Sequence, residues 1–338
     1  MKNYIRRILL GAIILCLMAS IIQAREYKIA TVAWIGWSPL NVAQELGFWK
    51  DLGVDVTVRN YDDPIVIFEA LKADRMDLAM DMAGSLIGIY VENEDIMIVA
   101  ETDWSNGGDQ IIAGKTYDMQ KHRNDTIGVF FHKPSCLYFL NRYLQTINMR
   151  LSDFRIVEIN PQDLTAQFIA RRLPVIVNYE PWATEAVKKG NGKILADSSI
   201  FKGCIPECIW GYNKKIKTVP QEDMIKILKG WIQAAKWIEN PDNRTRFYHI
   251  LKKNIFNTDL NLSEKELDKM LSHVIIHDAD ALYQRNITGG GLYQFIEDVK
   301  VFLAQNGMLK KDFIIEDIFD NHYILEALKQ EPPIIDKQ

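Results

Sequence analysis

Aromatic and acidic side chains gather in a few short segments of this 338-residue sequence, most of them directly after an apolar run. Aromatic faces attract cations and carboxylates accept hydrogen bonds from amines, so the combination is typical of a site for a cation or an amino-substituted heterocycle. Segments that follow strands are the expected place, because ligands of open α/β sheets bind beyond the carboxyl ends of the strands. The candidate ligand-binding residues are Trp34, Trp37, Asp81, Trp104, Asp109, Ser135, Tyr179, Glu180 and Trp182.

Some of these residue types also have structural uses. Carboxylates that precede a helix usually cap it, and capping explains Asp62, Asp63 and Asp163 better than ligand binding does. Trp182 falls in the first turn of a predicted helix and fits the core equally well. For the other acids, pairing with buried arginines is the structural alternative.

Sequence signals for catalysis are weak. His273 and His277 are four residues apart, a spacing that suits a metal on one helical turn, but residues 274–276 between them are typical of a buried strand. The sequence holds no G-x-S-x-G elbow, no P-loop and no dinucleotide fingerprint. We therefore expect a protein that is not an enzyme and that uses no cofactor and no metal.

The charge balance excludes nucleic acid as a partner. The chain has 40 lysines and arginines against 44 aspartates and glutamates, a formal net charge of −4, so it has no global positive field to hold a phosphate backbone. Its 48% hydrophobic and 25% charged residues are usual for a folded globular chain. We expect a monomer that binds a small molecule.

The first 24 residues have the composition of a secretory signal peptide. Lys2, Arg6 and Arg7 precede an uncharged apolar run over residues 8–22, and the segment closes with Gln23 and Ala24. An uncleaved membrane anchor is the alternative, and both place the body of the protein outside the cytoplasm, in the periplasm or its equivalent. No later segment is long and apolar enough to span a bilayer.

Three cysteines follow the signal peptide. An odd number in an oxidising compartment allows one bridge and one buried thiol. Cys204 and Cys208 lie in a segment with Gly203 and Pro206, a loop that could bring the two thiols together. A disulfide between them and two free thiols are the two alternatives.

Apolar periodicity divides the chain into two α/β lobes. Strand and helix patterns alternate from residue 27 to about 100, restart at 126 and continue to 189, and give way to long helical stretches after 208. We predict a two-lobed fold in which each lobe is a mostly parallel sheet flanked by helices. The expected domains are the signal peptide 1–24, lobe one 25–108, lobe two 109–208, and 209–338, which returns to lobe one with extra C-terminal helices. The crossings, and a hinge, are expected near 102–111 and 208–213.

Several motifs then resemble one protein family. They are Gly36-Trp37-Ser38-Pro39, the stretches 43–49 and 53–56, Asn160-Pro161-Gln162-Asp163 and Tyr179-Glu180-Pro181-Trp182. Together they resemble the periplasmic solute-binding proteins of nitrate, sulfonate and taurine ATP-binding-cassette (ABC) importers, a group that includes binders of thiamine-precursor pyrimidines. The resemblance covers about residues 27–196 and implies a two-lobed binding protein that delivers its ligand to a membrane permease.

The resemblance does not identify the ligand, but the acids narrow the class of ligand. Asp81, Asp109 and Glu180 would repel an oxyanion, and each desolvated like-charge contact costs on the order of 1 kcal/mol or more. We therefore predict an amine, amidine or amino-pyrimidine ligand, with Trp34 and Trp37 as stacking walls. The alternatives are a ligand sensor for a membrane receptor, a sulfonate, taurine or nitrate binder, and a pyrimidine-synthase-like enzyme, which the absence of a cysteine-rich segment disfavours.

Overall fold

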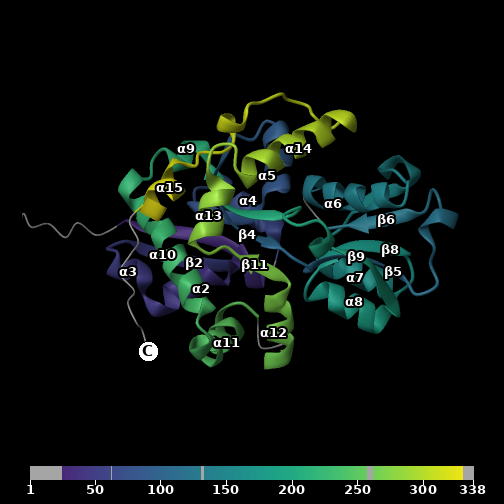
Figure 1. The fold of residues 1–338 in the computed structure, drawn as a ribbon, viewed down its shortest axis with the longest axis horizontal. Helices are drawn as coiled ribbons and strands as arrows, with labels where there is room; N and C mark the ends of the chain where they lie inside the picture. The colour runs from purple at the N-terminus through teal and green to yellow at the C-terminus, as the bar shows by residue number, and fades with distance from the viewer. Residues whose placement is uncertain (1–24, 62, 131–132, 257–261, 330–338) are drawn as a thin grey trace, which may run out of the picture.

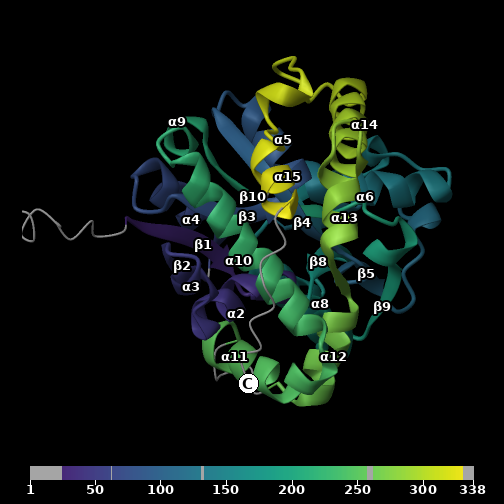
Figure 2. The same cartoon turned by 60° about the vertical axis from the view of Figure 1, so that its left-hand side comes forward.

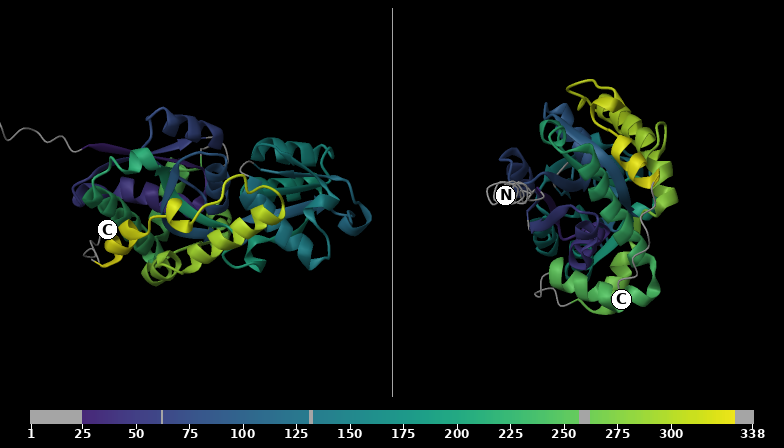
Figure 3. Two further views of the ribbon diagram at one scale, coloured as in Figure 1. Left: turned by 90° about the horizontal axis from the view of Figure 1, so that it is seen from above. Right: turned by 90° about the vertical axis from the view of Figure 1, so that its left-hand side faces the viewer.

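The computed structural model describes residues 25–61, 63–130, 133–256 and 262–329 (Figure 1). The predicted signal peptide and Asp62 lie outside these ranges. The described chain forms two α/β lobes that lie side by side along the longest axis of the molecule (Figure 3, left). Within the described ranges, no helix has both the length and the apolar character needed to cross a membrane.

Lobe one is built on a six-stranded sheet in the order β11-β4-β10-β3-β1-β2. The strands β1, β2 and β3 are parallel, whereas β10 pairs antiparallel with β3 and β4, and β11 pairs antiparallel with β4. The bounds are β1 Glu26–Val32, β2 Asp55–Tyr61, β3 Leu78–Met82, β4 Ile96–Ser105, β10 Pro206–Tyr212 and β11 Val274–Ile276.

Lobe two is built on a five-stranded sheet in the order β7-β6-β8-β5-β9. Here β6 is parallel to β7 and β8, while β5 is antiparallel to β8 and β9. The bounds are β5 Asp109–Gly114, β6 Thr126–Val129, β7 Arg155–Glu158, β8 Val175–Tyr179 and β9 Gly192–Asp197.

Helices cover the sheets of both lobes. Lobe one carries α2 Ser38–Leu46, α3 Phe48–Asp51, α4 Pro64–Lys72 and α5 Ala83–Val91, and lobe two carries α6 Lys133–Thr146, α7 Pro161–Ile169 and α8 Trp182–Gly190. Proline in the first turn and an αL glycine after the last residue delimit α2, as its sequence predicts. Asp63 caps α4 by accepting a hydrogen bond from the Ile65 amide, so its predicted capping role is confirmed.

The C-terminal helices return to lobe one, as predicted. Helix α10 packs against α2, α3 and α15, and α14 packs against α5 (Figure 2). Helix α14 also reaches lobe two, where Tyr138 of α6 meets Phe295 and Phe302 edge-on at 5.6 Å between ring centroids. The bounds are α9 Asn213–Ile216, α10 Gln221–Glu239, α11 Arg244–Asn254, α12 Glu264–Ser272, α13 Ala279–Asn286, α14 Gly291–Gln305 and α15 His322–Lys329.

The chain passes between the sheets twice. The first passage, residues 106–108 between β4 and β5, falls inside the predicted range. The second runs through residues 198–205, because β10 already belongs to the sheet of lobe one; the prediction of 208–213 was therefore too late. The two passages are tied together, since Ser105 Oγ lies 2.8 Å from Ser198 Oγ and the Gly107 amide donates to Ser198 Oγ at 2.6 Å.

The α/β fold class with two lobes is confirmed, with two differences in detail. The sheets are mixed rather than mostly parallel, because the strands next to the passages enter their sheets antiparallel to a neighbour. The Cys204–Cys208 disulfide does not form: both thiols are buried and free, because β10 extends the chain from Pro206 through Cys208. The exact domain bounds stay a prediction.

Candidate functional site

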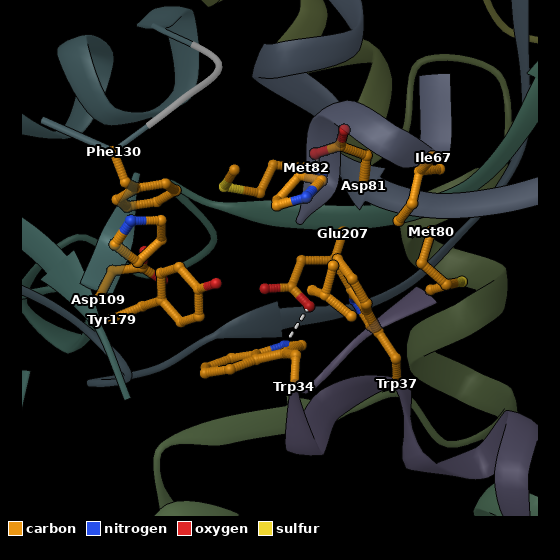
Figure 4. A pocket seen from close by; sticks show the side chains of 13 residues that line it. Trp34, Trp37, Ile67, Met80, Asp81, Met82, Asp109, Phe130, Tyr179 and Glu207 are labelled. Atoms are coloured by element: carbon orange, nitrogen blue, oxygen red, sulfur yellow. Dashed lines mark hydrogen bonds between the residues drawn. The ribbon is translucent and has the colours of Figure 1, made fainter. Parts of the chain in front are cut away.

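A cavity opens between the lobes where the ends of several strands meet (Figure 4). About 600 Å³ of space not filled by atoms lies between its walls, a volume that includes solvent at its open side. Its walls are mainly apolar or aromatic, with three acids. The lining residues are Val32, Trp34, Trp37, Pro64, Ile67, Met80, Asp81, Met82, Asp109, Phe130, Pro161, Tyr179 and Glu207.

Two indole rings from lobe one form one wall of the cavity. Trp34 follows β1 and donates its indole N–H to Glu207 Oε2 at 2.5 Å (Figure 4). Its ring fits only because two glycines lie beside it: a Cβ on Gly108 would lie 2.3 Å from Trp34 Cη2, and one on Gly36 would lie 2.5 Å from Trp34 Nε1. The indole N–H of Trp37 is buried and has no hydrogen-bond partner within the described residues.

Lobe two contributes a second aromatic wall and an acid. Tyr179 ends β8, and its ring meets Trp34 edge-on at 6.1 Å and Phe130 edge-on at 5.0 Å. Its hydroxyl points into the cavity (Figure 4). Asp109 begins β5 directly opposite Tyr179 in the sheet. The Trp34–Tyr179 contact therefore joins the two lobes across the cleft.

The cavity acids are buried, and burial changes how they titrate. Burial raises the pKa of Asp109 to about 7, although a hydrogen bond from Ser105 opposes the shift. Burial also holds the pKa of Glu207 well above its ordinary value, and the neighbouring Asp103 raises it further. Asp81 accepts a hydrogen bond from the Met82 amide at 2.7 Å.

The described ionisable side chains that line the cavity all become negative when they ionise. Among the described residues that line it, the ionisable side chains are Asp81, Asp109, Glu207 and Tyr179, and none is a lysine, arginine or histidine. No group of three or more histidine, cysteine, aspartate or glutamate side chains suited to a metal occurs in the described part of the chain.

Five of the nine predicted site residues line the cavity: Trp34, Trp37, Asp81, Asp109 and Tyr179. The remaining four lie outside it. Trp104 stacks edge-on with His277 at 4.8 Å and lies 5.0 Å from the Arg285 guanidinium carbon. Ser135 is fully buried between α5 and α6, where its hydroxyl meets that of Ser85 at 3.2 Å. Trp182 begins α8 and is half-buried.

Glu180 supports the junction of the lobes. Its carboxylate accepts hydrogen bonds from the Thr184 amide at 3.0 Å and hydroxyl at 2.7 Å, and from Gln110 Nε2 at 3.2 Å. His273 of lobe one lies 3.7 Å away. The Glu180 amide donates to Gly108 O in the first passage. These contacts give Glu180 a structural use at the first turn of α8.

Glu207 lines the cavity although it was not among the predicted site residues. It does not follow a strand: β10 runs antiparallel to β3 and β4, so its second residue reaches the edge where β3 ends. Glu207 is paired with Met82 and Asp103 across the two neighbouring strands. An acid at the start of a strand after a lobe crossing is the signal that could have found it.

The two lobes, the paired passages and the buried cleft define the periplasmic binding protein fold. Residues 22–252 match the NMT1-like family, and the chain belongs to that family. A curated relative is YtlA of Bacillus subtilis (strain 168), described as a candidate binding protein. It is 23% identical over 263 residues, which cover 72% of this chain and 75% of YtlA.

Solved structures share the fold at low sequence identity. The periplasmic nitrate-binding protein NrtA from Synechocystis PCC 6803 superposes with a TM-score of 0.74 at 16% identity, over 90% of this chain and 89% of NrtA. The ligand-binding component of an ABC-type import system from Staphylococcus aureus, with zinc bound, gives 0.71 at 14%, over 91% and 100%. The aliphatic sulphonate-binding protein SsuA from Escherichia coli gives 0.67 at 12%, over 88% and 92%. These relatives are described as binding proteins of differing ligands.

Proposed function

We propose that this protein is an extracytoplasmic solute-binding protein that captures a small nitrogen-containing ligand, an amine, amidine or amino-pyrimidine, between its lobes and delivers it to an ABC importer. The family and the fold support the binding role. The observation that supports the ligand class is the cavity itself, in which aromatic faces surround three buried acids and no lining residue in the described structure carries a positive charge.

The aromatic groups and acids divide the binding work. Trp34 and Trp37 supply flat faces for a ring or a cation. Asp109, Glu207 and Asp81 supply acceptors for N–H groups, and a charge-assisted hydrogen bond in a buried site is stronger than a neutral one. A nitrate or sulfonate would meet these acids, and no lysine, arginine or histidine is among the described residues that line the cavity.

Calorimetric titration tests the ligand class. We expect amines, amidines or amino-pyrimidines to bind and taurine and nitrate not to bind. Asp109→Asn should weaken the binding of a cation at least tenfold, whereas Glu316→Gln, an exposed acid outside the cavity, should leave it unchanged. Micromolar binding of taurine or nitrate, with no binding of the nitrogen compounds, would contradict the ligand class.

Closure about the two passages is the expected mechanical step. Ligand contacts from both lobes favour the closed arrangement, so the ligand shifts the population towards it. Small-angle scattering should show a smaller radius of gyration at saturating ligand. An unchanged radius would contradict closure.

A further inference from the structure

Two acids face each other at the floor of the cavity. Glu207 of β10 and Asp103 of β4 are directly opposite in the antiparallel pair, which places their side chains on the same face of the sheet, and the neighbouring Asp103 raises the pKa of Glu207. Both are buried, with 3% and 0% of their surface exposed. A register shift after Glu207 pairs the next residue, Cys208, with Glu101 instead of Thr102. This bulge gives Asp103 and Glu101 different partners.

Among the described residues, the side chains that hydrogen-bond this pair are neutral donors, and the His277 imidazole only opposes the rise in the pKa of Asp103 without bonding it. Trp34 Nε1 donates to Glu207 Oε2 at 2.5 Å, and Thr102 Oγ1 donates to Asp103 Oδ1 at 2.8 Å. The charged and titratable groups nearby are Glu101 on β4, Asp109 on β5, Asp81 on β3, Cys208 on β10, His277 after β11 and Arg285 on α13.

The two nearby basic side chains are already engaged by another acid. Arg285 Nε donates to Glu101 Oε1 at 2.7 Å, and His277 Nε2 lies 3.0 Å from the same oxygen. Two neighbouring carboxyl groups in a buried site repel each other strongly when both are ionised and no cation is bound between them. A proton shared by Glu207 and Asp103 would remove that repulsion.

We propose that Glu207 and Asp103 share one proton in the ligand-free protein and that a cationic ligand displaces it, so that binding exchanges one proton for one positive charge. This inference rests on the proposed function, because it requires a cationic ligand in the cavity. The proton passes to solvent, and an N–H of the ligand takes its place on the Glu207 carboxylate. Glu207 is then the residue that distinguishes a cation from a neutral molecule of the same shape.

Infrared spectroscopy of the ligand-free protein tests the shared proton. At about pH 8, where Asp109 is largely ionised, we expect the carbonyl stretch of a protonated carboxylic acid. Glu207→Gln and Asp103→Asn should each remove it, because the new amide donates to the remaining carboxylate. The matched control Glu101→Gln should keep it. A missing band, or one that survives both variants, overturns the inference.

Calorimetry in buffers of different ionisation enthalpy tests the exchange. The probe is benzamidinium, a flat aromatic cation, and its neutral counterpart is benzamide. At about pH 8 we expect benzamidinium to release close to one proton per molecule bound, its affinity to rise up to tenfold per pH unit, and benzamide to bind at least tenfold more weakly. Glu207→Gln should abolish the proton release.

The outcomes separate this inference from the proposed function. Binding of benzamidinium without proton release overturns the exchange and leaves the cation-binding function intact. Equal binding of benzamide and benzamidinium also overturns the exchange. If neither binds while taurine or nitrate does, the ligand class fails and the exchange fails with it.

Discussion

Two buried acidic clusters lie two residues apart on β4, and they are built in opposite ways. Glu101 has cationic partners inside the protein, Arg285 at 2.7 Å and His277 at 3.0 Å, and the Asn286 side chain bonds both of its backbone groups. Asp103 faces Glu207, and the described contacts give this pair only neutral donors. The first cluster ties α13 to the sheet, and the second borders the cavity.

The difference shows that burial alone does not identify a ligand-binding acid. Both clusters have lost their water, and buried carboxylates need a cation or a proton. Where the cation is a side chain, as for Glu101, the acid stabilises the fold. Where the described lining side chains provide none, as for Glu207, a proton or a ligand is the partner that we propose.

The largest expected effect comes from removing the internal cation. Arg285→Met leaves Glu101 buried without its main charge partner, so we expect a loss of about 3–5 kcal/mol in the free energy of unfolding. Chemical denaturation measures it.

Lys202→Met is the matched control for Arg285. Both cations lie over the Trp104 ring, with Lys202 Nζ at 5.8 Å, but in the described structure only Arg285 of the two contacts Glu101. Lys202→Met should cost under about 0.5 kcal/mol, and adding Glu101→Gln to Arg285→Met should recover part of the loss. Equal losses for Arg285→Met and Lys202→Met would contradict the structural role of the Glu101 cluster.

The second largest expected effect is a pH dependence of the free energy of unfolding, caused by the cavity residue Asp109. The pKa of Asp109 is raised from 3.8 to about 7, so the folded protein binds more protons than the unfolded chain between those values. Stability from this group is therefore greatest at low pH and is lost as pH rises towards 7, at about 1.4 kcal/mol per unit.

Asp109→Asn removes this dependence. The free energy of unfolding of the variant, minus that of the unmodified protein, should rise by about 3 kcal/mol from about pH 5 to pH 8. Chemical denaturation at both pH values measures it. Glu185→Gln, an ion-paired acid on α8, is the control and should show no such gain. Parallel pH profiles of Asp109→Asn and the unmodified protein would show that Asp109 does not titrate in this range.

Sequence patterns predicted the elements well where the signal is local. Helices α2 and α7 each have a proline in the first turn, and Gly47 after α2 and the Asn160 cap before α7 mark further ends, so these signals are contained within each segment. The aromatic wall of Trp34, Trp37 and Tyr179 was found because each follows a strand or ends one. Strand-end loops are thus a usable signal.

The sequence did not allow the partners of each acid to be predicted. A bulge gives Glu101 and Asp103 of β4 different partners on β10. In addition, α13 brings Arg285 to Glu101, 184 residues away in the chain. Glu180 resembled a ligand contact partly for the same reason: Thr184 is a local partner, but Gln110 and His273 come from distant segments. Long-range pairing therefore decides which acids are available to a ligand.

A smaller effect is expected from disturbing the indole that holds Glu207. A Cβ at Gly108 would lie 2.3 Å from Trp34 Cη2, so Gly108→Ala forces the ring to move, at about 1–3 kcal/mol. Trp34 should then lose its hydrogen bond to Glu207. Denaturation and tryptophan fluorescence measure both changes.

Gly114→Ala is the control for Gly108→Ala. Gly114 ends β5, and the nearest atom to its added Cβ is Tyr117 Cβ at 3.9 Å, an ordinary contact. An equal cost for the two variants would show that the Trp34 contact does not constrain the cavity.

The smallest expected effect distinguishes the two clusters most directly. Glu207→Gln should change the free energy of unfolding by less than about 1 kcal/mol near neutral pH, because the new amide supplies the donor to Asp103 that a shared proton otherwise supplies. Its carbonyl oxygen still accepts from Trp34. Glu101→Gln, the same substitution in the other cluster, removes the charge partner of Arg285 and should cost more, about 1–3 kcal/mol. Paired denaturation curves decide it: if Glu207→Gln destabilises the protein as much as Glu101→Gln does, Glu207 is held as a charged structural residue, and the distinction between the clusters fails.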